Sequence, residues 1–262
     1  MTGVPRGLNV RLATAAVLIA ALLAALLLLP TAWRAALATL LAALGALEWA
    51  RLCRMSGAAA WGYGAAMALA VVAAYHSDPW LPAFALSAAF WILAAPAWMW
   101  RGVAATQAPL LAAAGFVVLV PAALAMAVLP GLQVVLVLTL VSLADAAAYF
   151  AGSAWGTRKL APSISPGKTR EGAVAGLLVA LVYAMICGIF VEGIAWVPFL
   201  LSAALIAVLS IVGDLFESAL KRQAGAKDSG ALLPGHGGIL DRIDSATATL
   251  PVAALLIPWI SR

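Results

Sequence analysis

Charged residues are scarce in this chain. Only 10% of its 262 residues are Asp, Glu, Lys or Arg, and 66% are hydrophobic, whereas a soluble domain carries about 25% charged residues. The mean hydropathy is +1.09. Such a chain lacks the side chains needed to cover a soluble surface, which excludes an ordinary soluble domain. The net charge of +5 indicates nucleic acid only weakly, because in a membrane protein the placement of charge matters more than its sum. We predict no nucleic-acid partner.

Cysteine is almost absent as well. Cys53 and Cys187 are isolated and lie in or beside apolar segments. They fit neither a metal-ligand spacing nor a disulfide framework, so we interpret them as ordinary thiols. The sequence also shows no internal repeat of the kind that marks many transporters.

Long apolar runs are what the chain has in abundance. Runs of this length suffice to cross a bilayer, and they predict an all-α, polytopic integral membrane protein with about nine transmembrane helices. The first run exceeds the apolar core of a typical signal peptide, and no convincing cleavage site follows it, which favours a retained helix. The runs lie near residues 12–29, 31–50, 57–76, 79–100, 108–129, 132–152, 173–191, 194–216 and 246–260.

The cations predict the orientation of these helices. With a cytoplasmic N-terminus and nine spans, 13 of the 15 Lys and Arg residues lie on the cytoplasmic side, and only Arg34 and Arg262 lie outside. This agrees with the positive-inside rule and places the polar loops 153–172 and 217–245 in the cytoplasm. Abundant Ala and an excess of Arg over Lys fit a GC-rich bacterium, so we expect the cytoplasmic (inner) membrane. A homodimer is one option for the assembly.

Acidic residues divide the chain into two regions. Eight of the ten lie from Asp145 onward, and only Glu48 and Asp78 precede it. We therefore interpret 1–130 as a transmembrane scaffold and 131–262 as the catalytic region, which includes both polar loops.

A polar stripe follows the eighth apolar run. Asp214, Glu217, Ser218 and Lys221 have the spacing i, i+3, i+4 and i+7, which places them on one helix face. A ladder of ion pairs that solvates a helix end is the simpler interpretation. Because Asp214 directly follows an apolar run, we favour a functional role, since carboxylates at membrane depth are costly.

A second pair of acids stands where the last helix begins. Asp241, Asp244 and Ser245 fall on one face. Helix capping accounts for one acid, but not for two acids three residues apart. If this helix packs against the eighth, Asp214 and Asp241 meet, and carboxylates from two helices together with substrate phosphates are a usual way to hold Mg²⁺.

Glycines and cations lie between these two groups. His236 stands in the sequence Pro-Gly-His-Gly-Gly, where backbone N–H groups can turn toward an anion. The histidine is either a phosphate contact, an acid–base group or a structural loop residue. Lys221, Arg222 and Lys227 either bind phosphate or attract anionic lipid. The two interpretations agree if the substrate is an anionic lipid.

The other polar loop has the features of an anion site. Ser165, Lys168 and Thr169 precede a helix expected to begin near Glu171, and hydroxyls, a cation and a helix N-terminus together bind anions. Asp145 and Tyr149 lie upstream on one helix face. Asp145 is either part of the site or a buried aspartate that fixes helix packing.

These residues resemble a known family. The phosphatidate cytidylyltransferases, or CDP-diacylglycerol synthases, share a C-terminal motif that this chain matches in register over 27 positions. Asp145 with Tyr149 and the run from Ser165 to Gly172 are similar to the upstream part of the family. Ser153, Thr157 and Arg170 depart from residues common there. The matching elements are Ser218, Lys221-Arg222, Lys227-Asp228, Gly230, Leu233-Pro234, His236-Gly237-Gly238, Asp241-Arg242 and Asp244.

The resemblance implies that CTP and phosphatidic acid react to give CDP-diacylglycerol and pyrophosphate in phospholipid biosynthesis, at the membrane surface. Both substrates are anionic, so Mg²⁺, with or without a second metal ion, and protein cations must hold them together. We expect Asp214 and Asp241 to ligate the metal, with Asp244 and Asp145 as further ligands or supports. The expected phosphate contacts are Lys221, Arg222, Lys227, Arg242, Ser165, Lys168 and Thr169.

Two other functions stay open at this point. A CTP-dependent lipid kinase also brings a nucleotide to a membrane lipid, and it needs a base, for which His236 can serve. A secondary transporter belongs to a different class and also uses intramembrane acids. However, the acids here cluster at one face rather than at the midplane of the bilayer.

Overall fold

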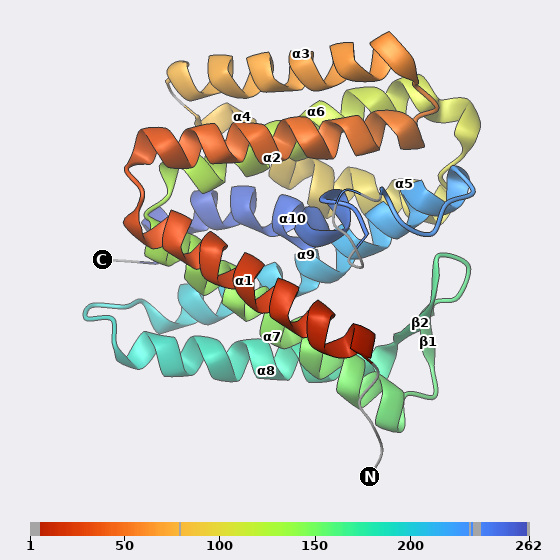
Figure 1. Ribbon diagram of the computed structural model, residues 1–262. Coiled ribbons are helices and arrows are strands. Elements are labelled where there is room, and N and C mark those ends of the chain that lie inside the picture. Colours follow the sequence, from red (N-terminus) through yellow and green to blue (C-terminus); the bar gives the residue numbers. More distant parts are fainter. Residues whose placement is uncertain (1–5, 79, 231, 233–236, 261–262) are drawn as a thin grey trace.

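The computed structural model describes residues 6–78, 80–230, 232 and 237–260, and this part of the chain is a bundle of long helices (Figure 1). Seven of its helical segments are long and apolar enough to cross a membrane, which confirms the all-α membrane class. The count of nine spans and the cytoplasmic N-terminus stay predictions. The helices are α1 (Arg6–Leu28), α2 (Thr31–Leu52), α3 (Gly57–His76), α4 (Leu81–Ala89), α5 (Ala95–Arg101), α6 (Ala108–Val128), α7 (Gly131–Trp155), α8 (Arg170–Ile189), α9 (Trp196–Gln223) and α10 (Leu240–Leu256).

The expected helices are present, but their polar ends extend further than hydropathy predicts. Helix α7 runs on to Trp155, α9 runs on to Gln223, and α10 begins at Leu240 rather than near 246. Hydropathy does not predict these polar helical turns, because a helix can continue into polar sequence where its backbone and side chains form hydrogen bonds. The predicted loops 153–172 and 217–245 are therefore shorter than expected. The polar stripe of Asp214, Glu217, Ser218 and Lys221 lies on α9 and is called the α9 stripe below. Asp241 and Asp244 lie on α10.

The loop between α7 and α8 contains a hairpin that the sequence analysis did not predict. Strands β1 (Lys159–Ala161) and β2 (Ser165–Thr169) pair antiparallel. The hairpin lies at the same end of the bundle as the segment between α9 and α10 (Figure 1). A hydrogen bond of 3.5 Å from Arg222 Nε to the Ile164 carbonyl joins the two polar segments.

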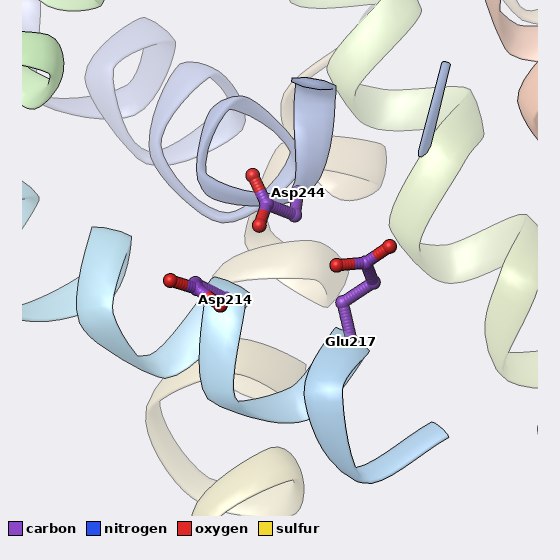
Figure 2. Close-up of side chains that lie close together, drawn as sticks. All are labelled: Asp214, Glu217 and Asp244. Atoms are coloured by element: carbon purple, nitrogen blue, oxygen red, sulfur yellow. The ribbon is translucent and has the colours of Figure 1, made fainter. Parts of the chain in front are cut away.

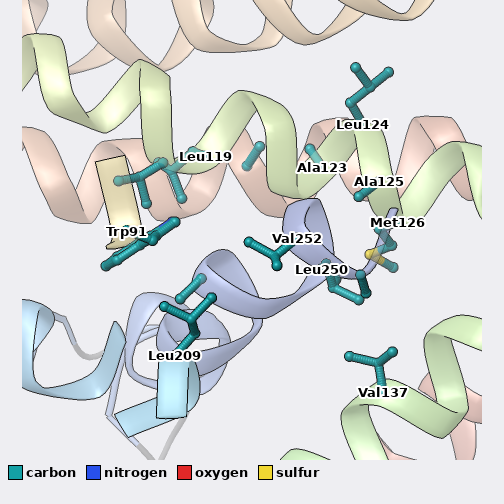
Figure 3. Packing of buried hydrophobic residues seen from close by; sticks show 14 of the residues in the cluster. Trp91, Leu119, Ala123, Leu124, Ala125, Met126, Val137, Leu209, Leu250 and Val252 are labelled. Atoms are coloured by element: carbon teal, nitrogen blue, oxygen red, sulfur yellow. The ribbon is translucent and has the colours of Figure 1, made fainter. Parts of the chain in front are cut away.

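Helix α10 lies in the interior of the bundle. It packs on α9 and α6 and also contacts α4 and α7, and its residues Leu250 and Val252 are buried among side chains of these neighbours (Figure 3). The polar N-terminal turns of α10 are therefore held by a rigid apolar core. Helices α4 and α6 belong to the proposed scaffold, 1–130, and α7, α9 and α10 belong to the proposed catalytic region, 131–262. Their contacts with α10 give the two regions one shared core.

An aromatic cluster around Phe216 fixes the position of α9 and of the polar stripe that it carries. Phe216, which has no exposed surface, lies between Asp214 and Glu217 in sequence and points into the bundle. Its ring centroid lies 5.4 Å from that of Phe90 and 5.7 Å from that of Trp91, both in edge-on geometry. Because aromatic pairs of this kind favour one orientation, the cluster fixes the rotation of α9 about its axis.

Small residues bring α7 and α8 close together. A Cβ atom at Gly172 would lie 2.5 Å from the Ala148 carbonyl oxygen, and one at Gly176 would lie 2.7 Å from the Ala144 carbonyl oxygen. Only glycine permits this approach at these two positions, as small-residue contacts do in other membrane helices. The start of α8 is thereby drawn against the part of α7 that carries Asp145.

Candidate active site

The α9 stripe forms as the spacing predicts. The Ser218 hydroxyl donates to Asp214 over 3.3 Å, and Lys221 Nζ donates to Glu217 Oε2 over 2.8 Å. Contacts between residues four apart place these side chains on one helix face. Glu217 is almost fully buried, with 3% of its surface exposed, so the stripe does more than solvate a helix end.

Three carboxylates meet where α9 and α10 cross. One oxygen each of Asp214, Glu217 and Asp244 lie within 4.8 Å of one another (Figure 2). Gly213 makes the crossing possible, because a Cβ atom there would lie 2.7 Å from the Asp244 carbonyl oxygen. Carboxylates this close repel one another unless a cation or a proton intervenes.

The cluster has the chemistry of a divalent metal site. Its donors are hard oxygens from two helices, which suit Mg²⁺. Glu217 Oε1 is buried and has no hydrogen-bond partner, and a buried polar atom without a partner is costly. The donor set and this unsatisfied oxygen both fit a bound cation.

Asp241 is not part of this cluster, contrary to the sequence-based expectation that it meets Asp214. It lies almost one turn earlier on α10 and accepts hydrogen bonds from Lys221 Nζ at 2.6 Å, Gly238 N at 2.8 Å, and the backbone N–H and hydroxyl of Ser229, both at 3.0 Å. Burial opposes ionisation of Asp241, but the hydrogen bonds outweigh it and lower its pKa to about 2. Glu217 occupies the place in the cluster that was predicted for Asp241.

A cavity of about 370 Å³ adjoins the cluster. Asp214 lies in its wall and also belongs to the carboxylate cluster. Lys168 Nζ lies 2.5 Å from Asp214 Oδ2, so strand β2 contacts α9 across the cavity. The cavity joins most of the upstream residues that the sequence analysis selected: its polar lining includes Asp145, Tyr149, Ser165, Lys168, Thr169 and Asp214.

The remaining predicted residues belong to α9, to α10 and to the segment between these helices. Arg222 and Arg242 are exposed on α9 and α10, and Lys227 and Asp228 are exposed in the segment between them. His236 lies outside the described residues. Arg222 contacts the hairpin at Ile164, whereas Arg242 lines a separate, mostly apolar pocket with residues of α2 and α6.

Thr169 caps the helix at the cavity wall. Its side chain accepts a hydrogen bond of 3.1 Å from Gly172 N, at the first turn of α8. Loss of such a cap costs about 1 kcal/mol. We expect Thr169→Val to lower the free energy of unfolding by about 1 kcal/mol. Thr169→Ser keeps the hydroxyl and should retain the wild-type free energy of unfolding. Unfolding in detergent micelles measures both values. Equal stability of the two variants would contradict the capping role.

Sequence reasoning assigned no role at the site to Glu48 and left Glu217 out of the expected ligands. Glu48 lies on α2 with no exposed surface and accepts hydrogen bonds from Ser229 and from the start of α10. An acid within an apolar run is the signal that marks it. Glu217 was seen in the stripe, but spacing alone did not show which acid faces α10.

The fold and the site define a helical membrane protein with a carboxylate cluster and an adjoining polar cavity that contains Lys168 in its wall. The chain belongs to the cytidylyltransferase family, whose sequence model matches residues 9–260. It is 41% identical to the phosphatidate cytidylyltransferase of Pseudomonas aeruginosa over 274 aligned positions, which cover 95% of this chain and 97% of that protein.

Two further relatives match over a shorter stretch. The chain is 48% identical over 120 residues to the phosphatidate cytidylyltransferase of Haemophilus influenzae, covering 44% of this chain and 42% of that protein. It is 47% identical over 118 residues to that of Bacillus subtilis, covering 45% of this chain and 44% of that protein.

Proposed function

We propose that the chain transfers the cytidylyl group of CTP to phosphatidic acid and releases pyrophosphate, giving CDP-diacylglycerol for phospholipid biosynthesis. The observation that carries this proposal is the junction at Asp214, where the carboxylate cluster meets the cavity lined by Lys168. A site for two anionic substrates needs both parts. The 41% identity over 95% of the chain to a phosphatidate cytidylyltransferase supports the same activity.

The reaction needs little acid–base chemistry from the protein. An oxygen of the lipid phosphate attacks the α-phosphorus of CTP and forms the new P–O bond. The bond from the α-phosphorus to the oxygen that bridges to the β-phosphate breaks, and pyrophosphate leaves with the electron pair. The lipid phosphate is already ionised near neutral pH, so no base is required, and catalysis rests on positioning and on neutralising charge.

Asp214, Glu217 and Asp244 would hold the divalent metal, for which Mg²⁺ is the expected ion. Bound there, it supplies positive charge next to the phosphates. Asp145 lies in the wall of the same cavity and is the candidate for supporting a second ion. Asp241 instead holds Lys221, and Lys221 keeps a positive charge beside Glu217.

The cations would bind the phosphate groups of the two substrates. Lys168, with the hydroxyls of Ser165 and Thr169, faces one phosphate in the cavity at the start of α8. Tyr149 lines this cavity from α7, and Ser218 donates a hydrogen bond to Asp214 from the next turn of α9. The lysine and arginine side chains in and next to the segment between α9 and α10 would bind the remaining anionic groups: Lys221, Arg222, Lys227 and Arg242. Asp228 and His236 remain proposed substrate contacts on the basis of the sequence.

The membrane arrangement follows from the same proposal. We place the chain in the bacterial inner membrane with nine spans, a cytoplasmic N-terminus and the site facing the cytoplasm, where CTP is found. The hairpin and the segment between α9 and α10 lie at one end of the bundle (Figure 1), which supports this placement. Residues 131–262 form the catalytic region on the scaffold of 1–130, and a homodimer is the proposed assembly.

One assay tests the proposed activity. Purified protein in detergent micelles is incubated with phosphatidate, Mg²⁺ and CTP labelled at the α-phosphorus. We expect labelled CDP-lipid and one pyrophosphate per turnover, and loss of both when EDTA removes the metal. Formation of CDP and a phosphorylated lipid would instead indicate a lipid kinase. The absence of any nucleotide turnover would contradict the proposal and leave a transporter.

A further inference from the structure

Glu48 is a buried carboxylate for which the proposed reaction has no direct use. It belongs to α2, in the scaffold half, and none of its surface is exposed. It accepts hydrogen bonds from Ser229 Oγ at 2.9 Å, Ile239 N at 3.1 Å and Leu240 N at 2.8 Å. Within the described part of the chain, no ion pair includes Glu48. Because a buried carboxylate is costly unless it is hydrogen-bonded, these donors hold it in place, and it holds them.

The segment between α9 and α10 is shaped to admit this carboxylate. A Cβ atom at Gly238 would lie 2.6 Å from Glu48 Oε1, and one at Gly230 would lie 2.8 Å from Glu48 Cδ. Real Cβ atoms do not approach so closely. A side chain at either glycine would therefore displace the Glu48 carboxylate from its hydrogen bonds with Ile239 and Leu240, which lie nearly 200 positions away in sequence.

The same carboxylate caps α10. Ile239 and Leu240 are at the N-terminus of this helix, where N–H groups have no partner within the helix. The N-cap residue of α10, Ile239, supplies no capping side chain. Glu48 accepts from both N–H groups, and its negative charge lies at the positive end of the helix dipole. The first turns of α10 carry Asp241 and Asp244, so the capped helix start determines where these acids lie.

We infer that Glu48 is a positioning residue that clamps Ser229 to the start of α10 at Ile239 and Leu240. The clamp places Asp244 in the carboxylate cluster and Asp241 on Lys221. This inference rests on the proposed function for its kinetic consequences and on the hydrogen bonds alone for its structural ones. Two separate measurements therefore test it.

The kinetic test compares Glu48→Gln with Asp78→Asn. Asp78 is the other acid of the first 130 residues, and it is exposed. Glutamine keeps the shape of Glu48 but turns an NH₂ group toward one of the donors. We expect turnover to fall at least tenfold and the Mg²⁺ concentration for half-maximal rate to rise at least threefold, while Asp78→Asn leaves both unchanged. A purely structural role would lower the amount of active protein and leave the Mg²⁺ dependence unchanged.

The second measurement is amide hydrogen exchange in the metal-free protein, without substrates. In the wild type, the amides of Ile239 and Leu240 should exchange more slowly than those of the exposed residues Lys227 and Asp228. Glu48→Gln should speed their exchange at least tenfold and leave α7 and α8 unchanged. If this variant does not fold, Glu48→Asp, which keeps the charge but is one methylene shorter, should show the same faster exchange.

The two failures are distinguishable. If the wild type forms no CDP-lipid, the proposed function is overturned. The amide hydrogen exchange of Ile239 and Leu240 still tests the clamp, because it needs no turnover. Wild-type turnover, Mg²⁺ dependence and exchange in Glu48→Gln would overturn the clamp and leave the proposed function intact. Fast exchange of the Ile239 and Leu240 amides in the wild type would overturn it as well.

Discussion

Asp214→Asn and Asp244→Asn should each lower cytidylyl transfer about a thousandfold. A metal ion that stabilises transition-state charge contributes several kcal/mol, and a loss of about 4 kcal/mol corresponds to a factor of about a thousand in rate. Asparagine keeps the size of each side chain but removes one of the three charges that meet within 4.8 Å. Initial rates of CDP-lipid formation at saturating CTP measure the effect.

The control for this experiment is Asp78→Asn, an exposed acid outside the catalytic region. The amount of folded protein is compared by gel filtration in detergent. Since removal of one carboxylate relieves repulsion in the cluster, we expect Asp244→Asn to be no less stable than the wild type without metal. Asp214→Asn also loses its ion pair with Lys168, so the rates of both variants are normalised to the amount of folded protein. Retention of more than a tenth of wild-type turnover by either variant would contradict its assignment as a ligand.

Asp214 and Asp241 were both predicted from the sequence to be metal ligands, and a metal-binding experiment distinguishes them. Mg²⁺ should raise the unfolding temperature of the wild type and of Asp241→Asn, since a ligand stabilises the state it binds. It should not raise that of Asp214→Asn. Loss of the Mg²⁺ response in Asp241→Asn would contradict the exclusion of Asp241 from the metal site, and a response kept by Asp214→Asn would contradict the assignment of Asp214 as a ligand.

Lys221→Met should destabilise the protein by about 3–5 kcal/mol, the cost of removing one partner from a buried ion pair. Lys221 Nζ lies 2.8 Å from Glu217 and 2.6 Å from Asp241, and the two acidic side chains are only 4% and 11% exposed. Methionine fills the space of the lysine stem, so the loss reports the missing charge. The free energy of unfolding in detergent, followed by circular dichroism, measures it.

Two further variants serve as controls for Lys221→Met. Lys227→Met removes a lysine from an exposed position and should change the free energy of unfolding by less than about 0.5 kcal/mol. Lys221→Arg keeps the charge and should recover part of the stability, although its planar group is not interchangeable with an ammonium. If Lys221→Met is as stable as Lys227→Met, the ion pairs do not hold α10 against α9.

Hydropathy and spacing predicted much of this arrangement from local sequence. Helix positions follow from apolar runs of spanning length, and the α9 stripe follows from helical periodicity, which needs no knowledge of neighbours. Ser165, Lys168 and Thr169 were predicted to form an anion site, and the structure places them in one cavity with Asp145. Thr169 caps α8 as its position before that helix allows.

The partners of each acid were not predictable in this way. Asp241 and Asp244 are almost one helical turn apart, and both were reasonable partners for Asp214. The close approach of Gly213 to the Asp244 carbonyl selects Asp244, while the backbone N–H groups of Ser229 and Gly238 take Asp241. The β-hairpin between α7 and α8 was missed because its strands are short and bounded by polar residues.

By itself, the sequence determined the membrane class, the helix positions and the residue types that carry the chemistry, because each depends on composition or on spacing within one helix. Tertiary structure alone decided which carboxylates converge and which one supports the others. Those outcomes depend on where helices cross and on which backbone N–H groups end without a helical partner. Glu48 shows the difference, because only the folded chain brings α2 to the start of α10.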